Sequence, residues 1–86
     1  MPFVLTGRFR RAYRALSDEE QERVQKALRM MSEELRHPGL RVKRVRGTHG
    51  VWEARASRAL RLTFEVDGDK IVLRNVGGHD ATLKKP

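Results

Sequence analysis

Hydrophobic and polar residues alternate most regularly at positions 60–66, which predicts a β-strand with one face on a core and the other in water. One face of this strand holds its apolar residues, which are Leu60, Leu62, Phe64 and Val66. Shorter runs at 51–56 and 70–76 flank it, and Asp67-Gly68 suits a tight hairpin turn because glycine takes positive φ at little cost. We therefore expect a three-stranded meander to organise the fold.

The polar residues of the first two strands of this meander are expected to share one face. Pairing of the strands would bring together Glu53, Arg55, Arg61 and Thr63. The other face would hold Trp52, Ala54 and Ala56, which we expect to pack on the core. Arg74 on the third strand fits either face. The meander leaves through Gly77-Gly78-His79-Asp80, which is expected to be a flexible exit that carries a histidine.

A brief helix is predicted over residues 8–16, because apolar residues recur there at i, i+3, i+4 and i+7. Residues 3–5 before it are apolar and suit an edge strand or a staple over that helix. Residues 40–46 are expected to form a basic strand, whose imperfect alternation suggests a bulge or an edge position. The tail, residues 81–86, is short.

A second and longer helix is predicted to follow Ser17 and to extend to about Arg36. Ser17 and Glu20 have the spacing of a capping box, and acidic residues in the first turn favour the positive end of the helix dipole. His37-Pro38-Gly39 should end this helix, with His37 as a C-terminal cap partner.

The predicted element order is β-α-α-β-β-β-β. Helices followed by a meander indicate an α+β fold, with a small antiparallel sheet and two N-terminal helices packed on one face. No linker, repeat or low-complexity tract interrupts the chain of 86 residues, so we expect residues 1–86 to form a single domain.

The composition narrows the chemistry that the chain can perform. It has no cysteine, which excludes disulfides and thiolate metal sites, and its three histidines lack metal-ligand spacing. We therefore predict no metal and no cofactor. No apolar run approaches the ~20 residues that span a bilayer, and the first residues do not resemble a signal peptide. The expected location is the cytoplasm.

The charge indicates an anionic partner. The formal net charge is +8, and it is unevenly spread. Residues 1–17 hold four arginines and no acid, residues 18–34 hold six acids and three bases, and residues 35–86 hold twelve bases and five acids. Nucleic acid, an anionic membrane or an acidic protein would fit this charge. Arginine, which predominates, binds phosphate in bidentate fashion.

The residues also suggest a way to cleave RNA without a metal. Such a nuclease must hold the phosphate, stabilise its developing charge and move protons from the 2′-hydroxyl to the leaving oxygen. Guanidinium groups do the first two, and a histidine or an acid does the third. Arg55 and Arg61 share the predicted polar face, and His79 follows the last strand. Asp80 and Glu53 remain further candidates for the proton transfers.

Four segments of the sequence are similar to a known family. They are VRG at 45–47, WEAR at 52–55, LRLTFEV at 60–66 and VGGHD at 76–80. Together they resemble the RelE/ParE toxin superfamily, and most closely the RelE-type, ribosome-dependent mRNA interferases. The resemblance implies cleavage of mRNA in the ribosomal A site, without metal, by attack of the 2′-oxygen to leave a cyclic phosphate. It also implies mRNA, the ribosome with its 16S rRNA and a neutralising antitoxin as partners.

The resemblance assigns roles to residues of this chain. Arg61 matches the family's phosphate-holding arginine, His79 its catalytic histidine or arginine, and Arg55 a basic residue on the preceding strand. We expect nucleic acid to be bound by Lys43, Arg46, His49, Arg58, Arg74 and Lys84. Two departures stand out: Glu53 lies where a second basic residue can occur, and the aromatic residue that many members place after the histidine is missing.

Two other functions remain open from the sequence. A ParE-like toxin that inhibits DNA gyrase would share the fold but would not need a basic catalytic cluster, and the pairing of His79 with Arg61 argues against it. A non-catalytic module that binds RNA or the ribosome would also be basic, and the missing aromatic residue supports it.

Overall fold

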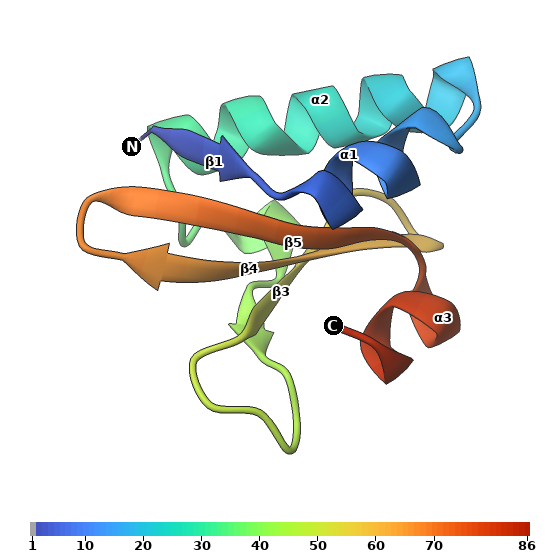
Figure 1. Cartoon of the computed structure of the whole chain (residues 1–86). Coiled ribbons are helices and arrows are strands. Elements are labelled where there is room, and N and C mark those ends of the chain that lie inside the picture. Colours follow the sequence, from blue (N-terminus) through green and yellow to red (C-terminus); the bar gives the residue numbers. More distant parts are fainter. Residues whose placement is uncertain (1) are drawn as a thin grey trace.

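The computed structural model describes residues 2–86, which form a mixed sheet in the strand order β1-β5-β4-β3-β2 (Figure 1). The strands are β1 (Phe3–Leu5), β2 (Lys43–Arg44), β3 (Trp52–Arg55), β4 (Leu60–Asp67) and β5 (Lys70–Gly78). The predicted meander is therefore confirmed, and so is the edge position of the first strand. The prediction of a purely antiparallel sheet is corrected, because β1 pairs with β5 in parallel.

The helices cover both faces of this sheet. They are α1 (Gly7–Arg14), α2 (Asp18–Glu33), the short 3₁₀ helix η1 (Pro38–Leu40) and α3 (His79–Lys84). The predicted pair α1 and α2 lies on one face, whereas α3 lies on the opposite side (Figure 1). The core between the helix pair and the sheet contains Phe9, Val24, Ala27, Met31, Leu40, Ala54, Leu62, Phe64, Ile71, Leu73 and Val76. Trp52 packs against this core as predicted, with the guanidinium groups of Arg36 and Arg44 over its ring.

The start of α2 agrees with the predicted capping box. The Ser17 hydroxyl accepts a hydrogen bond from the Glu20 amide at 3.2 Å, and the Glu20 carboxylate accepts one from the Ser17 amide at 2.9 Å. Both bonds satisfy amide groups that no helical carbonyl can reach.

Ser17→Ala is expected to lower the free energy of unfolding by about 1 kcal/mol, because alanine cannot accept the Glu20 amide proton. Urea denaturation measures the change. Ser32→Ala, near the other end of α2, is the control and should leave the midpoint nearly unchanged, because its hydroxyl only bonds the Arg29 carbonyl on an exposed surface. Equal midpoints for Ser17→Ala and the wild type would show that the cap contributes nothing.

Two predicted boundaries are wrong. The helix α2 ends at Glu33 rather than near residue 36, because Glu34 is already extended. The predicted strand over residues 40–46 shrinks to Lys43–Arg44, because η1 precedes it and Arg41 adopts a left-handed conformation with φ 48°. The predicted edge position of that strand is confirmed. His37 accepts a hydrogen bond from the Gly39 amide, so it caps the start of η1 rather than the end of α2.

The exit from the meander is ordered rather than flexible. The strand β5 continues to Gly78, and His79 begins α3, which packs on β4 and β5. Gly77 permits this packing, because a Cβ at that position would lie 3.0 Å from the Thr82 hydroxyl. Gly77 thus allows β5 and α3 to approach closely, whereas the composition of this segment suggested that it is flexible.

A bulge in β5 determines the position of Arg74. Thr63 pairs with Asn75 but Phe64 pairs with Leu73, so Arg74 is the additional residue. Its guanidinium lies 2.9 Å from the Glu65 carboxylate. Arg74 therefore joins the polar side of the sheet, which the sequence left open.

Candidate functional site

The sheet face opposite α1 and α2 carries the residues predicted to do chemistry. We call it the polar face, and it holds Lys43, Glu53, Arg55, Arg61, Thr63 and Glu65. Strand register places these side chains together, because directly paired residues in a sheet project to the same side. The predicted shared face of β3 and β4 is confirmed.

Two arginines lie directly opposite each other on this face. Arg55 of β3 pairs with Arg61 of β4, and both side chains are partly buried. Like charges directly opposite each other destabilise a sheet. An anion bound between them would remove this repulsion and would receive charge-assisted hydrogen bonds from two guanidinium groups. The pair is therefore suited to hold a phosphate.

The loop between β3 and β4 fixes the Arg61 side chain. Its Nη1 lies within hydrogen-bonding distance of the carbonyl oxygens of Ser57, Arg58 and Leu60, at 2.9, 3.2 and 3.1 Å. Its Nε lies 3.9 Å from the Glu53 carboxylate. The side chain is 16% exposed. These contacts hold the guanidinium in one orientation before any ligand arrives, which is the condition for electrostatic catalysis.

His79 lies at the same end of the sheet as Arg61. Its backbone amide donates to the Ala59 carbonyl at 3.1 Å, so the loop that holds the Arg61 guanidinium also holds the start of α3. The imidazole is half exposed, and its Nδ1 lies 2.9 Å from the Asp80 carboxylate. This contact with Asp80 orients the imidazole ring.

A hollow of about 330 Å³ opens on the polar face, with Glu53 in its wall. Its lining consists of Lys43, Arg44, Val45, Arg46, Glu53 and Leu83. The predicted RNA-binding residues Lys43 and Arg46 therefore meet here. Sequence reasoning did not anticipate the contribution of Leu83, because it depends on the packing of α3.

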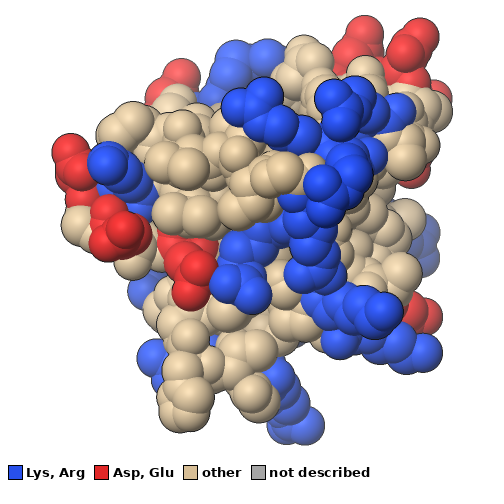
Figure 2. All heavy atoms as spheres, viewed as in Figure 1, with Lys and Arg blue, Asp and Glu red and all other residues tan. Residues whose placement is uncertain are grey.

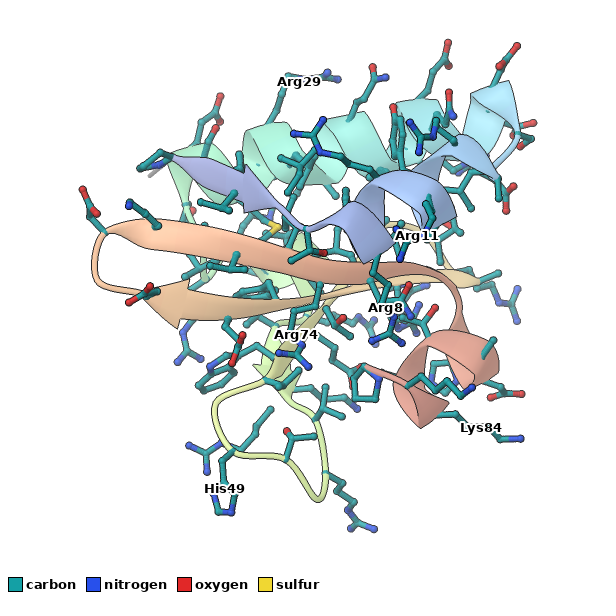
Figure 3. The ribbon with its side chains drawn as sticks, viewed as in Figure 1. Arg8, Arg11, Arg29, His49, Arg74 and Lys84 are labelled. Carbon is teal, nitrogen blue, oxygen red and sulfur yellow. The ribbon has the colours of Figure 1, made fainter. Side chains whose placement is uncertain are left out.

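The other predicted RNA-binding residues do not line this hollow. Arg58 is exposed on the loop between β3 and β4. Lys84 ends α3 and points into solvent, whereas His49 projects from the loop between β2 and β3, away from the sheet (Figure 3). His49 is therefore not brought together with the other candidates.

The Arg74 side chain is bound by other residues of this protein. Besides its ion pair with Glu65, its Nε donates to the Pro86 carbonyl at 3.1 Å. Asn75 donates to the Lys85 carbonyl at 3.0 Å, and Arg8 of α1 donates to the same carbonyl. The last residues thus lie across one end of the polar face, where sequence reasoning expected only a short tail.

Basic side chains also gather outside the polar face. Figure 2 shows a nearly continuous band of lysine and arginine on one side of the molecule. Arg8 and Arg11 of α1 and Lys84 of α3 lie along that side in Figure 3. Arg8 and Arg11 therefore extend the basic surface beyond the site itself.

Within residues 2–86, no group of three or more histidine and acidic side chains is arranged to hold a metal ion. None of the helices described is long and apolar enough to cross a membrane.

Comparison with solved structures identifies the fold. The YoeB/ParE toxin from Agrobacterium tumefaciens superimposes with a TM-score of 0.77 at 16% identity, over 92% of this chain and 99% of that one. YafQ from E. coli strain BL21(DE3) gives 0.77 at 8% identity, over 92% and 93% of the two chains. The chain therefore has the same fold as these two toxins.

Other solved structures with this fold contain an antitoxin. The RelB–RelE antitoxin–toxin complex from Methanococcus jannaschii matches the RelE-like chain described here with a TM-score of 0.71 at 17% identity, over 96% of this chain and 99% of that one. No protein-family model matches the sequence, and no curated protein matches it significantly. At these identities the likeness establishes the RelE-like fold, and the activity has to be argued from the side chains.

Proposed function

We propose that this RelE-like protein is a toxin that cleaves mRNA in the ribosomal A site and so inhibits translation. The observation that carries the proposal is the in-register pair of Arg55 and Arg61 beside a basic hollow. A gyrase inhibitor has no need of two guanidinium groups paired on one sheet face. The resemblance of the sequence to RelE-type interferases supports the same choice.

The proposed reaction uses side chains alone. Arg55 and Arg61 hold the scissile phosphate. The 2′-hydroxyl gives its proton to an acceptor on the enzyme as its oxygen attacks the phosphorus and the bond to the 5′-oxygen breaks. The His79 imidazolium gives its proton to that leaving oxygen, which leaves a 2′,3′-cyclic phosphate. Lys43, Arg46, Arg58, Arg74, Lys84 and His49 would contact the flanking RNA and the 16S rRNA.

The experiment that tests this function uses purified ribosomes carrying a short mRNA with an occupied P site. Addition of the protein should cut the message within the A-site codon, also in the presence of a chelator, and should leave free mRNA largely intact. Binding to the programmed ribosome without a cleaved product would instead favour the non-catalytic RNA-binding alternative, and the proposed reaction would be wrong.

We further propose a cognate antitoxin as a cytoplasmic partner. The net charge of +8 and the basic polar face fit an acidic segment that becomes ordered on binding. Analytical ultracentrifugation of the protein with the product of the adjacent gene should show a stable complex, in which mRNA cleavage is suppressed. Separate sedimentation of the two proteins would count against this partner.

A further inference from the structure

Glu53 is a charged residue with a buried side chain, which is rare for glutamate. It lies at the centre of the polar face and is only 5% exposed. Its carboxylate forms one ion pair within residues 2–86, the long contact of 3.9 Å to the Arg61 Nε, and accepts no hydrogen bond from them. A buried carboxylate is normally paired or hydrogen-bonded more fully than this. Its oxygens are therefore available to a ligand.

The orientation of Arg61 places such a ligand next to Glu53. The Nη1 of Arg61 is occupied by loop carbonyls, so a phosphate would bind through the remaining Nε and Nη2 edge. The Glu53 carboxylate lies at that same edge. A phosphate held by Arg61 would thus have the carboxylate as its immediate neighbour.

The hollow leaves room on the same side for the ribose. Glu53 forms part of its wall, and its volume of about 330 Å³ is at the lower end of the ~300–1,000 Å³ typical of ligand pockets. The charged side chains that line the hollow with Glu53 are the basic Lys43, Arg44 and Arg46, and α3 contributes the apolar Leu83. The carboxylate is the only proton acceptor of acidic type in this lining.

The other acids near the site are unsuited to this task. The Asp80 side chain is 95% exposed and bound to His79. Glu65 is paired with Arg74 at 2.9 Å and lines a different groove with Thr6 and Val72. Of the candidates that the sequence left open, the geometry selects Glu53.

We propose that Glu53 is the catalytic residue that accepts the proton of the attacking 2′-hydroxyl, an inference that rests on the RNA-cleaving function proposed above. The carboxylate takes this proton as the 2′-oxygen bonds to phosphorus. The electrons of the breaking bond leave with the 5′-oxygen, which receives a proton from His79. The enzyme ends with a protonated Glu53 and a neutral imidazole, and exchange with water restores both.

The test compares Glu53→Gln and Glu53→Ala with the wild type in single-turnover cleavage on programmed ribosomes. Glutamine keeps the shape but cannot accept the proton, so the rate should fall about 100-fold or more, within the ~10²–10⁴-fold range of general acid–base catalysis. Formate, a small carboxylate that fits the space vacated in Glu53→Ala, should restore part of the rate to that variant and none to Glu53→Gln. Glu22→Gln, at an exposed glutamate of α2 outside the polar face, should cleave like the wild type.

The pH dependence separates a proton acceptor from a residue that merely positions Arg61. If Glu53 accepts the proton, the wild-type cleavage rate should rise with pH. Glu53→Gln should lose this rise while binding the ribosome as tightly as the wild type. A slow Glu53→Gln enzyme that keeps the wild-type profile, or a Glu53→Ala enzyme that formate does not rescue, would assign Glu53 to positioning and overturn the inference.

The experiments distinguish failure of the proposed RNA-cleaving function from failure of the proposed role of Glu53. If the wild type cleaves and Glu53→Gln cleaves equally fast, only the role of Glu53 is wrong. If the wild type fails to cleave ribosome-bound mRNA under any of these conditions, the proposed function is wrong and the role of Glu53 is rejected with it.

Discussion

Arg61→Ala is expected to lower the rate of mRNA cleavage by about 10²–10³-fold, the usual cost of removing one fixed donor to the charge of a transition state. The carbonyls of Ser57, Arg58 and Leu60 hold the Arg61 guanidinium in place, so the variant loses a donor whose orientation is fixed. Single-turnover cleavage on programmed ribosomes measures the loss. Arg61→Lys should recover little, because an ammonium lacks the planar fork that grips phosphate.

Arg29→Ala is the matched control for this experiment. Arg29 is exposed on α2, on the side of the molecule away from the polar face (Figure 3), and its loss should leave cleavage unchanged. A folded Arg61→Ala variant that cleaves at the wild-type rate would contradict the proposed phosphate site.

The stability of Arg61→Ala has to be measured alongside its activity. Removing one partner of a buried ion pair can cost about 3–5 kcal/mol, because the other charge stays buried. The Glu53 side chain is 7% exposed, so its charge would be left in this state. The double variant Glu53→Gln with Arg61→Ala should therefore regain stability in urea denaturation without regaining cleavage. This outcome would separate the loss of chemistry from unfolding.

His79→Ala is expected to slow cleavage by about 10²–10⁴-fold, the range for loss of a general acid. His79 is half exposed, and its ring is oriented by Asp80, so the fold should tolerate alanine. The measurement uses two versions of one message, with oxygen or with sulfur as the leaving atom. A thiolate leaves without a proton, so His79→Ala should cleave the sulfur version nearly as fast as the wild type does.

His37→Asn is the control, because asparagine can still accept the Gly39 amide at the start of η1. It should cleave both messages like the wild type. An equal loss on the oxygen and sulfur messages for His79→Ala would show that His79 does not protonate the leaving group.

Periodicity and capping motifs in the sequence predicted the elements that are determined by residues close together in the chain. The alternation of Leu60, Leu62 and Phe64 predicted both the strand β4 and its buried face, because side chains in a strand repeat every two residues. Ser17 and Glu20 predicted the start of α2 for an equally local reason. The two-residue period of side chains in strands also predicted that Arg55 and Arg61 share a face.

Features that depend on packing between distant segments were missed. The strands β1 and β5 pair in parallel although they lie far apart in the sequence, so no local periodicity predicts this pairing. The helix α3 is six residues long, too short to show a periodic stripe, and it is held by contacts such as that of Thr82 with Gly77. The two-residue period placed Glu53 on the polar face, but its burial to 5% exposure depends on tertiary packing, which no local pattern shows.

The central claim is that this protein cuts translated mRNA, and primer extension tests it most directly. The protein is induced in cells that carry one reporter message with a start codon and a second that lacks it. New RNA ends should appear only in the translated message, at one fixed position within codons, and upstream fragments should end in a 2′,3′-cyclic phosphate. A translated message that stays intact while the wild-type protein accumulates, or equal cutting of both messages, would contradict the account.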